Sequence, residues 1–257
     1  MSQSVAITRA ISSSIVACEL THLERTPIDV EKARAQHRAY EEALIEAGYL
    51  LLRLDTSPQM PDSVFVEDIA VVFDELAIVT RPGAESRRQE APAVAEALAA
   101  YRPLQTIQAP ATVDGGDVLV AGRTVVVGRS SRTNEGGVRQ IRQGLEPLGY
   151  TVADTIVHGC LHLKSAVTAL ADDVVLANPD WIDRSVFGRF KIIEVDSAEP
   201  NAANALRLDD RVIVAQAYPR TAERIEQAGF KVCAIDASEL AKAEGALTCC
   251  SLIVASR

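Results

Sequence analysis

The sequence predicts an α/β fold made of five similar units that close into a ring. The first observation is a repeat, in which two short apolar segments joined by a polar turn precede a helical or looped segment and a third apolar segment. The second is that segment 252–255 can pair with segment 5–8, so that both ends of the chain complete the fifth unit. A closed ring is favoured over an open solenoid, because a solenoid needs polar capping repeats that the sequence does not show.

The unit that contains segment 5–8 continues with a helix and a strand. Asp29 is a suitable N-cap and Gly48 a suitable stop for a helix whose apolar side chains recur at helical spacing. These side chains are Val30, Ala33, His37, Tyr40, Leu44 and Ala47. Segment 49–54 follows as the predicted strand.

The other four units each begin with a hairpin. The hairpins share two apolar segments around a polar turn, and they span 69–79, 118–127, 166–177 and 205–215, the last with its turn at Asp209 and Asp210. Helices are expected over 91–100, over 138–145 and through Ile225, whereas the segment around Trp181 fits a helix or a loop. The predicted third strands include 150–153, 192–195 and 230–235.

Composition limits the class of protein and its partners. With 257 residues, of which 48% are hydrophobic, the chain can bury a large core, and we expect a single catalytic domain over 1–257. The net charge of −9 argues against nucleic acid and anionic membranes and is compatible with a small cationic ligand. No apolar run approaches the roughly 18 residues of a membrane span. The cysteines lack framework spacing and the N-terminus lacks a signal-like segment, so we expect a cytoplasmic protein with free thiols.

Each unit carries polar side chains at one equivalent position, immediately before its first hairpin strand. These side chains are Glu67 with Asp68, Asp114, His162, Asn201 and Cys249. Equivalent positions in a closed ring converge on its axis. Carboxylates, an imidazole and a thiol are therefore expected at one central site.

Cys249 is the candidate nucleophile of this site. Only a thiolate attacks efficiently, so it needs a neighbouring base or cation, which His162 can provide. Asp114 can hold the imidazole in one tautomer and orientation. We expect the Cys249 sulfur to be exposed on a polar turn; the alternatives are a small buried cysteine and a structural histidine.

The acids at the axis indicate a cationic ligand. Glu67 and Asp68 would repel each other and Asp114 unless a cation neutralised them or one acid was protonated. A metal is the less favoured explanation, because His162 and Cys249 lack partner ligands at close spacing. We therefore expect no metal.

Three arginines follow second hairpin strands, close to predicted helix starts. A cation is unfavourable at a helix N-terminus, so Arg87 and Arg132 each need an anionic partner, either a substrate carboxylate or a protein acid. We take Arg220 as structural. A ligand with a cationic head, an electrophilic carbon and a distal carboxylate fits the site, as arginine and its derivatives do.

The chain resembles the dimethylarginine dimethylaminohydrolases, a family of the guanidine-modifying superfamily. The resemblance runs over nearly the whole chain and rests on the segments 62–68 (DSVFVED), 81–88 (RPGAESRR), 114–117 (DGGD), 131–134 (SRTN), 161–165 (LHLKS), 202–204 (AAN) and 247–251 (LTCCS). It implies a five-bladed α/β propeller, or pentein, around a central site. It also implies Cys249 as nucleophile, His162 as acid and base, and Asp114 as the residue that orients the imidazole.

The resemblance further implies a set of substrate contacts and no cofactor. Asp62, Glu67 and Asp68 would hold the guanidinium, and Phe65 would pack against it. Arg87 and Arg132 would hold the α-carboxylate. Leu20, on a loop over the site, would contact the α-amino end through its backbone.

One segment near the nucleophile departs from the family pattern. Where the family has an apolar residue followed by Asp-Gly, this chain has Ala243, Glu244 and Gly245. Ala243 and Glu244 are expected beside the substrate, and the extra methylene of Glu244 leaves open which methylated arginine, or other ω-substituted guanidine, is preferred.

The predicted activity is hydrolysis of dimethylarginine or monomethylarginine to citrulline and an alkylamine through a covalent thiouronium, by a monomer or a homodimer. One alternative is arginine deiminase or amidinotransferase chemistry, although those enzymes are usually longer. A second alternative is a five-fold ring binding protein like the ribosome anti-association factors. Those proteins lack the axial thiol, imidazole and acids.

Overall fold

The computed structural model describes residues 3–209 and 211–256, and it contains five sheets of three strands with one common topology. In strand order the sheets are β15-β1-β2, β3-β4-β5, β6-β7-β8, β11-β10-β9 and β12-β13-β14. Each middle strand pairs antiparallel with the short strand of its hairpin and parallel with the strand on its other side. The five-fold repeat of hairpin and third strand is therefore confirmed.

The strands are short. They are β1 (Val5–Arg9), β2 (Leu50–Leu54), β3 (Ala70–Val72), β4 (Ala77–Val79), β5 (Leu104–Thr106), β6 (Val118–Ala121), β7 (Thr124–Arg129), β8 (Thr151–Ile156), β9 (Val167–Ala169), β10 (Val174–Ala177), β11 (Lys191–Glu194), β12 (Ala205–Leu208), β13 (Arg211–Ala215), β14 (Lys231–Ile235) and β15 (Leu252–Val254). The predicted turn at Asp209 and Asp210 lies between β12 and β13, but Asp210 is outside the described residues.

Four helices connect the parallel strands of four units. They are α1 (Val30–Glu46), α2 (Ala91–Ala99), α3 (Glu135–Leu145) and α5 (Pro219–Gln227), and the chain also has two single-turn helices, α4 (Leu163–Ala166) and α6 (Ser238–Ala241). In the remaining unit, residues 178–190 are all described and form turns without a helix, so the segment around Trp181 is a loop.

The boundaries of α1 follow from its sequence. The carboxylate of Asp29 accepts a hydrogen bond from the backbone N–H of Lys32, as an N-cap does. Gly48 takes a positive φ of 92° just after the helix, a conformation that glycine adopts without steric cost. Tyr40 and Leu44 are buried in the core, and burial of a side chain such as Leu44 contributes roughly 1.5–3 kcal/mol.

The two ends of the described chain meet in one sheet. β1 pairs antiparallel with β15, with Ala6 opposite Ile253, and parallel with β2, with Ala6 opposite Leu51. The prediction that segments 5–8 and 252–255 pair is confirmed.

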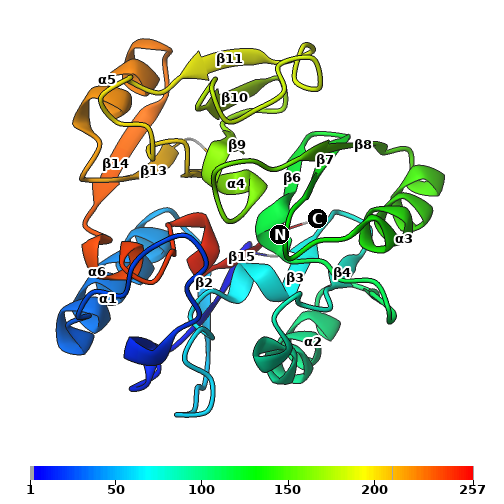
Figure 1. Cartoon of the computed structure of the whole chain (residues 1–257), viewed down its shortest axis with the longest axis horizontal. Helices are drawn as coiled ribbons and strands as arrows, with labels where there is room; N and C mark the ends of the chain where they lie inside the picture. Colours follow the sequence, from blue (N-terminus) through cyan, green and yellow to red (C-terminus); the bar gives the residue numbers. More distant parts are fainter. Residues whose placement is uncertain (1–2, 210, 257) are drawn as a thin grey trace.

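The short hairpin strands of all five sheets line one cavity of about 250 Å³. Each of these strands contributes to the wall, and the contributors include Val71, Leu119, Thr168, Leu206 and Ile253. Figure 1 shows the sheets arranged around a common centre, with α1, α2, α3 and α5 at the periphery. We call this space the axial cavity.

A single helical turn precedes four of these five strands. The turns are η2 (Val66–Ile69) before β3, η4 (Gly115–Asp117) before β6, α4 before β9 and η6 (Thr248–Cys250) before β15. They place Asp68, Asp114, His162 and Cys249 at one end of the axial cavity, although the sequence did not predict the turns. Among the described helices, none is both long enough and apolar enough to cross a membrane.

Candidate active site

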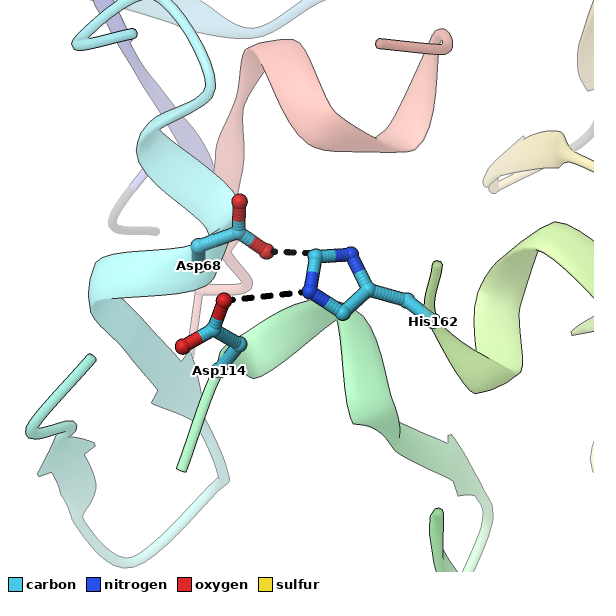
Figure 2. A group of neighbouring side chains, drawn as sticks. All are labelled: Asp68, Asp114 and His162. Atoms are coloured by element: carbon cyan, nitrogen blue, oxygen red, sulfur yellow. Dashed lines mark hydrogen bonds and ion pairs between the residues drawn. The ribbon is translucent and has the colours of Figure 1, made fainter. Parts of the chain in front are cut away.

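The imidazole of His162 lies between two carboxylates. Its Nε2 is 3.1 Å from Asp114 Oδ2, and its Nδ1 is 3.8 Å from Asp68 Oδ1. Figure 2 shows both aspartates pointing toward the ring, each from a different turn. All three side chains are buried. The structure therefore brings together an imidazole and two of the acids that the repeat predicted at the axis.

A third acid, Asp117, fixes the backbone beside the imidazole. Its Oδ1 accepts a hydrogen bond of 3.0 Å from the N–H of Leu163, the residue after His162, and its Oδ2 accepts one of 2.6 Å from Ser130 Oγ. Burial raises the pKa of Asp117 to about 6, against the opposing effect of His162. The DGGD segment contained this acid, but its spacing alone did not assign it a role.

Gly116 leaves the space that the imidazole occupies. A Cβ at this position would lie 2.6 Å from His162 Nδ1 and 2.8 Å from Asp68 Oδ1, which real Cβ contacts do not tolerate. The backbone N–H of Gly116 donates to Asp68 Oδ1 at 3.1 Å. Gly116 therefore has two effects. Its N–H holds the Asp68 carboxylate, and its lack of a side chain leaves room for the His162 ring.

These acids control the charge of His162. Burial disfavours the imidazolium, but the charge of Asp68, the hydrogen bond that the ring donates to Asp114, and the charge of Asp117 outweigh it and raise the pKa of His162 to about 9. The pKa of Asp68 is lowered because His162 and Arg87 overcome the effect of burial. At neutral pH the site holds an imidazolium, which can donate a proton to a leaving group.

Cys249 lines the same cavity as His162, Asp114 and Asp68, a space of about 30 Å³ that we call the catalytic cavity. The prediction of an exposed sulfur was wrong, since Cys249 is only 9% exposed. The reason is that Cys249 lies in the buried turn η6 and packs within a hydrophobic cluster, and the cavity that it lines is small. Within the described residues, no hydrogen bond joins the Cys249 sulfur to the imidazole.

The surroundings of Cys249 favour its protonated thiol. Burial, together with the charges of Glu67 and Asp68, raises the pKa of Cys249 far above its usual range. Neighbouring Cys250 is fully buried in a hydrophobic cluster.

Glu67 faces the axial cavity and is absent from the described lining of the catalytic cavity. Its Oε1 accepts a hydrogen bond of 2.7 Å from Lys164 Nζ, and its Oε2 accepts one of 2.7 Å from Thr248 Oγ1. Asn204 Nδ2 donates to the same Thr248 oxygen at 2.9 Å. Asn201, the equivalent position in the repeat, is exposed. The hydrogen bonds from Thr248 to Glu67 and from Asn204 to Thr248 fix Thr248, the residue before Cys249.

Asp62 and Phe65 both line the catalytic cavity. Burial raises the pKa of Asp62 to about 6, although Arg87 lowers it. The Asp62 carboxylate accepts a hydrogen bond of 3.1 Å from the N–H of Glu19 in the covering loop. The Phe65 ring lies so close to Gly245 that a Cβ there would be 2.0 Å from it.

The two arginines predicted to hold a carboxylate differ in their partners. Arg87 is buried, and its guanidinium donates to Asp68 at 2.5 Å, to Glu90 at 3.0 Å and to the carbonyl of Phe65 at 2.8 Å. Protein acids therefore satisfy it. Arg132 is partly exposed and donates to Thr21 Oγ1 at 3.0 Å.

Among the described residues, Arg132 forms no ion pair with a protein acid, although it lines the catalytic cavity. Arg220 lies on the surface, 3.8 Å from Asp196, which agrees with a structural assignment.

The remaining predicted contacts lie on two facing segments. Ala243 and Glu244 line the catalytic cavity. Leu20 is partly buried against a hydrophobic cluster, and its neighbour Glu19 provides the loop's contribution to the cavity wall. The carboxylate of Glu244 is occupied by backbone N–H groups of residues 21–23.

Asp68, Asp114 and His162 offer ligand atoms that lie within 4.8 Å of one another, a spacing that a metal ion could use. The donors already have partners in the protein. Asp68 is bound by Arg87 and by the N–H of Gly116, and Asp114 Oδ1 accepts a hydrogen bond from the N–H of Gly83 at 2.9 Å. Arg87 already balances the charge of Asp68 in this group.

Comparison with known proteins agrees with this geometry. The family described as "N,N dimethylarginine dimethylhydrolase, eukaryotic" matches residues 18–254. A dimethylarginine dimethylaminohydrolase of Streptomyces coelicolor is 42% identical over 249 residues, which cover 96% of this chain and 95% of that protein. The solved structure of the Pseudomonas aeruginosa enzyme, a cysteine-to-serine variant complexed with citrulline, has a TM-score of 0.93 and 36% identity, and covers 98% of this chain and 100% of that chain.

A further solved structure contains a covalent ligand. It is a histidine-to-glycine variant of dimethylarginine dimethylaminohydrolase in an adduct with S-methyl-L-thiocitrulline, with a TM-score of 0.92, 36% identity, and coverage of 98% of this chain and 100% of that chain. The fold and the site together define a hydrolase of the pentein superfamily that acts on C–N bonds. The chain belongs to the dimethylarginine dimethylaminohydrolase family.

Proposed function

We propose that this protein hydrolyses Nω-methylated arginine to citrulline and an alkylamine, with Cys249 as the covalent nucleophile. The observation that carries the proposal is the catalytic cavity, where the Cys249 thiol, an imidazolium and buried aspartates face one enclosed space. The citrulline and thiocitrulline ligands of the related structures support the same chemistry.

The first step forms the covalent intermediate. The sulfur attacks the planar guanidinium carbon, a C–S bond forms, and the bond from that carbon to the methylated nitrogen breaks. The thiol proton is released to solvent when the substrate binds, and His162 delivers its own proton to the departing amine, which leaves the imidazole neutral. The product of this step is a cationic S-alkylthiouronium on Cys249.

Water completes the cycle. A water molecule adds to the thiouronium carbon and His162 accepts a proton from it, after which the C–S bond breaks and citrulline leaves. Cys249 recovers its proton, and the remaining proton is taken up by the released amine as an alkylammonium ion. Asp114 holds the imidazole in position through both steps.

Entry of the substrate cation favours the thiolate. The same acids that raise the pKa of Cys249 in the ligand-free site attract a guanidinium, whose positive charge offsets them. We therefore assign Asp68 and Asp62 to the guanidinium, with Phe65 packed against it. The imidazolium and the bound guanidinium share this acidic environment.

The remaining contacts follow from the partners in the structure. Arg132, which forms no ion pair with a protein acid among the described residues, would bind the α-carboxylate. Arg87 would act by holding Asp68, and Glu67 by holding Thr248. Leu20 would meet the α-amino end through its backbone, and Ala243 would lie beside the substrate in the wall of the catalytic cavity.

We further propose that the five units form one closed propeller and a single catalytic domain over residues 1–257, active as a monomer or homodimer. The shared wall of the axial cavity supports ring closure. A cytoplasmic location is supported by the five cysteines, which are all free thiols.

The test is citrulline formation from dimethylarginine, monomethylarginine and arginine, measured side by side with Cys249→Ser as the control. We expect turnover of a methylated substrate and a loss of about 10³-fold or more in the serine variant. Turnover of unsubstituted arginine alone would assign the protein to the deiminases. Full activity of the serine variant would eliminate Cys249 as the nucleophile.

A further inference from the structure

The loop that covers the catalytic cavity is fastened to the protein on several sides. The backbone N–H of Glu19 donates to Asp62 at 3.1 Å, and the Glu19 carboxylate accepts a hydrogen bond of 2.6 Å from Ser86. Arg132 donates to the hydroxyl of Thr21 at 3.0 Å. We call residues 18–25 the covering loop.

Glu244 makes a denser set of contacts with this loop. Its Oε2 accepts a hydrogen bond of 2.9 Å from the N–H of Thr21, and its Oε1 accepts bonds of 2.5 Å from His22 and 2.6 Å from Leu23. Three consecutive backbone donors thus converge on one carboxylate. Charge-assisted hydrogen bonds of this kind are stronger than those between neutral groups.

The backbone of Glu244 has an unfavourable conformation. Its φ is +57°, in the left-handed region that residues with a Cβ seldom adopt. Such a conformation persists where surrounding contacts require it. In Glu244 it directs the carboxylate toward the covering loop.

The catalytic cavity is too small for the proposed substrate while the loop is in this position. Its volume is about 30 Å³, and a single water molecule needs roughly 10–15 Å³ on such a measure. A methylated arginine is several times larger than two waters. The covering loop must therefore move before substrate enters.

A second cavity of about 360 Å³ lies against the first. The two cavities share Leu161, Glu244 and Gly245 in their walls, and His22 and Leu23 of the covering loop line the larger one. Glu244 therefore stands in the wall between the cavities, and the loop residues that it holds, His22 and Leu23, form part of the outer wall beside it. We call the larger space the outer cavity.

We propose that Glu244 is a positioning residue that closes the covering loop over bound substrate, and that its release joins the catalytic cavity to the outer cavity as the route for substrate and product. This proposal rests on the proposed function, since it concerns access to the same site. Glu244 acts through the loop amides, and both of its carboxylate oxygens are already engaged by them.

The first measurement is amide hydrogen exchange at residues 21–23 of the ligand-free protein, which requires no turnover. Glu244→Gly removes the carboxylate and suits the positive φ, so it should fold; Glu244→Gln and Glu244→Asp weaken the contact in smaller steps. We expect exchange at these amides to accelerate by about tenfold or more in the glycine variant, with the other two intermediate. The control is Glu24→Gln, which removes the same charge from an exposed side chain of the same loop.

The second measurement is steady-state kinetics with a methylated arginine. We expect KM to rise by about tenfold in Glu244→Gly and kcat to change by less than about threefold, because Glu244 contacts the loop and not the reacting atoms. The same increase in KM, relative to the unmodified protein, should appear with a substrate analogue that lacks the α-amino group.

Three results would overturn the proposal. Unchanged exchange at residues 21–23 would show that Glu244 does not hold the loop. Faster exchange with an unchanged KM would show that opening of the covering loop does not affect substrate binding. An effect that vanished with the analogue lacking the α-amino group would mean that Glu244 binds that group directly. Failure of the proposed function would appear separately, as absence of turnover in the unmodified protein.

Discussion

His162 Nε2 lies 3.1 Å from Asp114 Oδ2, and Asp114 Oδ1 accepts a hydrogen bond from the N–H of Gly83. The carboxylate that orients the imidazole is therefore itself held by the backbone of another unit. Asp68 approaches the other ring nitrogen at 3.8 Å. The ring orientation thus depends on residues from two units other than the one that carries His162.

Asp114→Asn should impair catalysis without unfolding the protein. The neutral amide keeps the shape of the side chain but removes a charge that raises the pKa of His162 from 6.5 toward about 9. We expect activity to fall by about 10²- to 10⁴-fold and the pKa of the imidazole to decrease. A pH–rate profile and NMR titration of His162 would measure both. An unchanged imidazole pKa would contradict the assigned role of Asp114.

The stability of the protein should depend on pH through His162. Its folded-state pKa of about 9 is above the unfolded value of 6.5, so protonation stabilises the fold fully below pH 6.5, and this stabilisation is lost as the pH rises through about 9. We expect the free energy of unfolding to decrease between these values. Urea denaturation at several pH values, compared with His162→Gln, would isolate the contribution. If the free energy of unfolding of His162→Gln changed with pH as steeply as that of the native protein, the stabilising contribution of His162 would be refuted.

Gly116→Ala should displace the imidazole. The added methyl group would lie 2.6 Å from His162 Nδ1, and overpacking of this kind typically costs about 1–3 kcal/mol. We expect a large loss of activity with a folded protein. Gly144→Ala is the matched control, because the atoms that its Cβ meets belong to the flexible end of Gln105. Activity and thermal stability measured together would distinguish displacement of the ring from general destabilisation.

Arg87→Met should lower the stability of the protein, whereas Arg132→Met should weaken substrate binding. Loss of buried Arg87 leaves Asp68 and Glu90 without their cation, and breaking a buried ion pair costs about 3–5 kcal/mol. Arg132→Met should leave stability nearly unchanged and raise KM for substrates that carry an α-carboxylate. Denaturation and kinetics of both variants would test the contrast. Equal effects on stability would contradict it.

The sequence predicted the repeat because the signals for its parts are local. Alternating apolar segments, polar turns and helix caps such as Asp29 depend on a few neighbouring residues. The convergence of Asp68, Asp114, His162 and Cys249 followed from their equivalent positions in the repeat. This reasoning needed no knowledge of individual contacts.

Predictions about particular contacts fared less well, because these contacts join residues that are distant in sequence. The family resemblance implied that Arg87 holds a substrate carboxylate, whereas the sequence itself also allowed a protein acid, and Asp68 and Glu90 are its partners in the structure. Glu67 was expected at the guanidinium, yet Lys164 and Thr248 hold both of its oxygens. Such pairings are decided by side-chain packing around the axis, and spacing along the chain does not encode them.

The pairing of β1 with β15 also determines when, during synthesis of the chain, Cys249 reaches its place in the site. Cys249 is the last of the site residues to leave the ribosome, and its turn is fixed only once β15 docks beside β1, one of the first strands made. A partly synthesised chain therefore cannot organise the thiol against the imidazole. Cys249 therefore reaches the cavity that it shares with His162 only after the first and last strands of the described chain have paired.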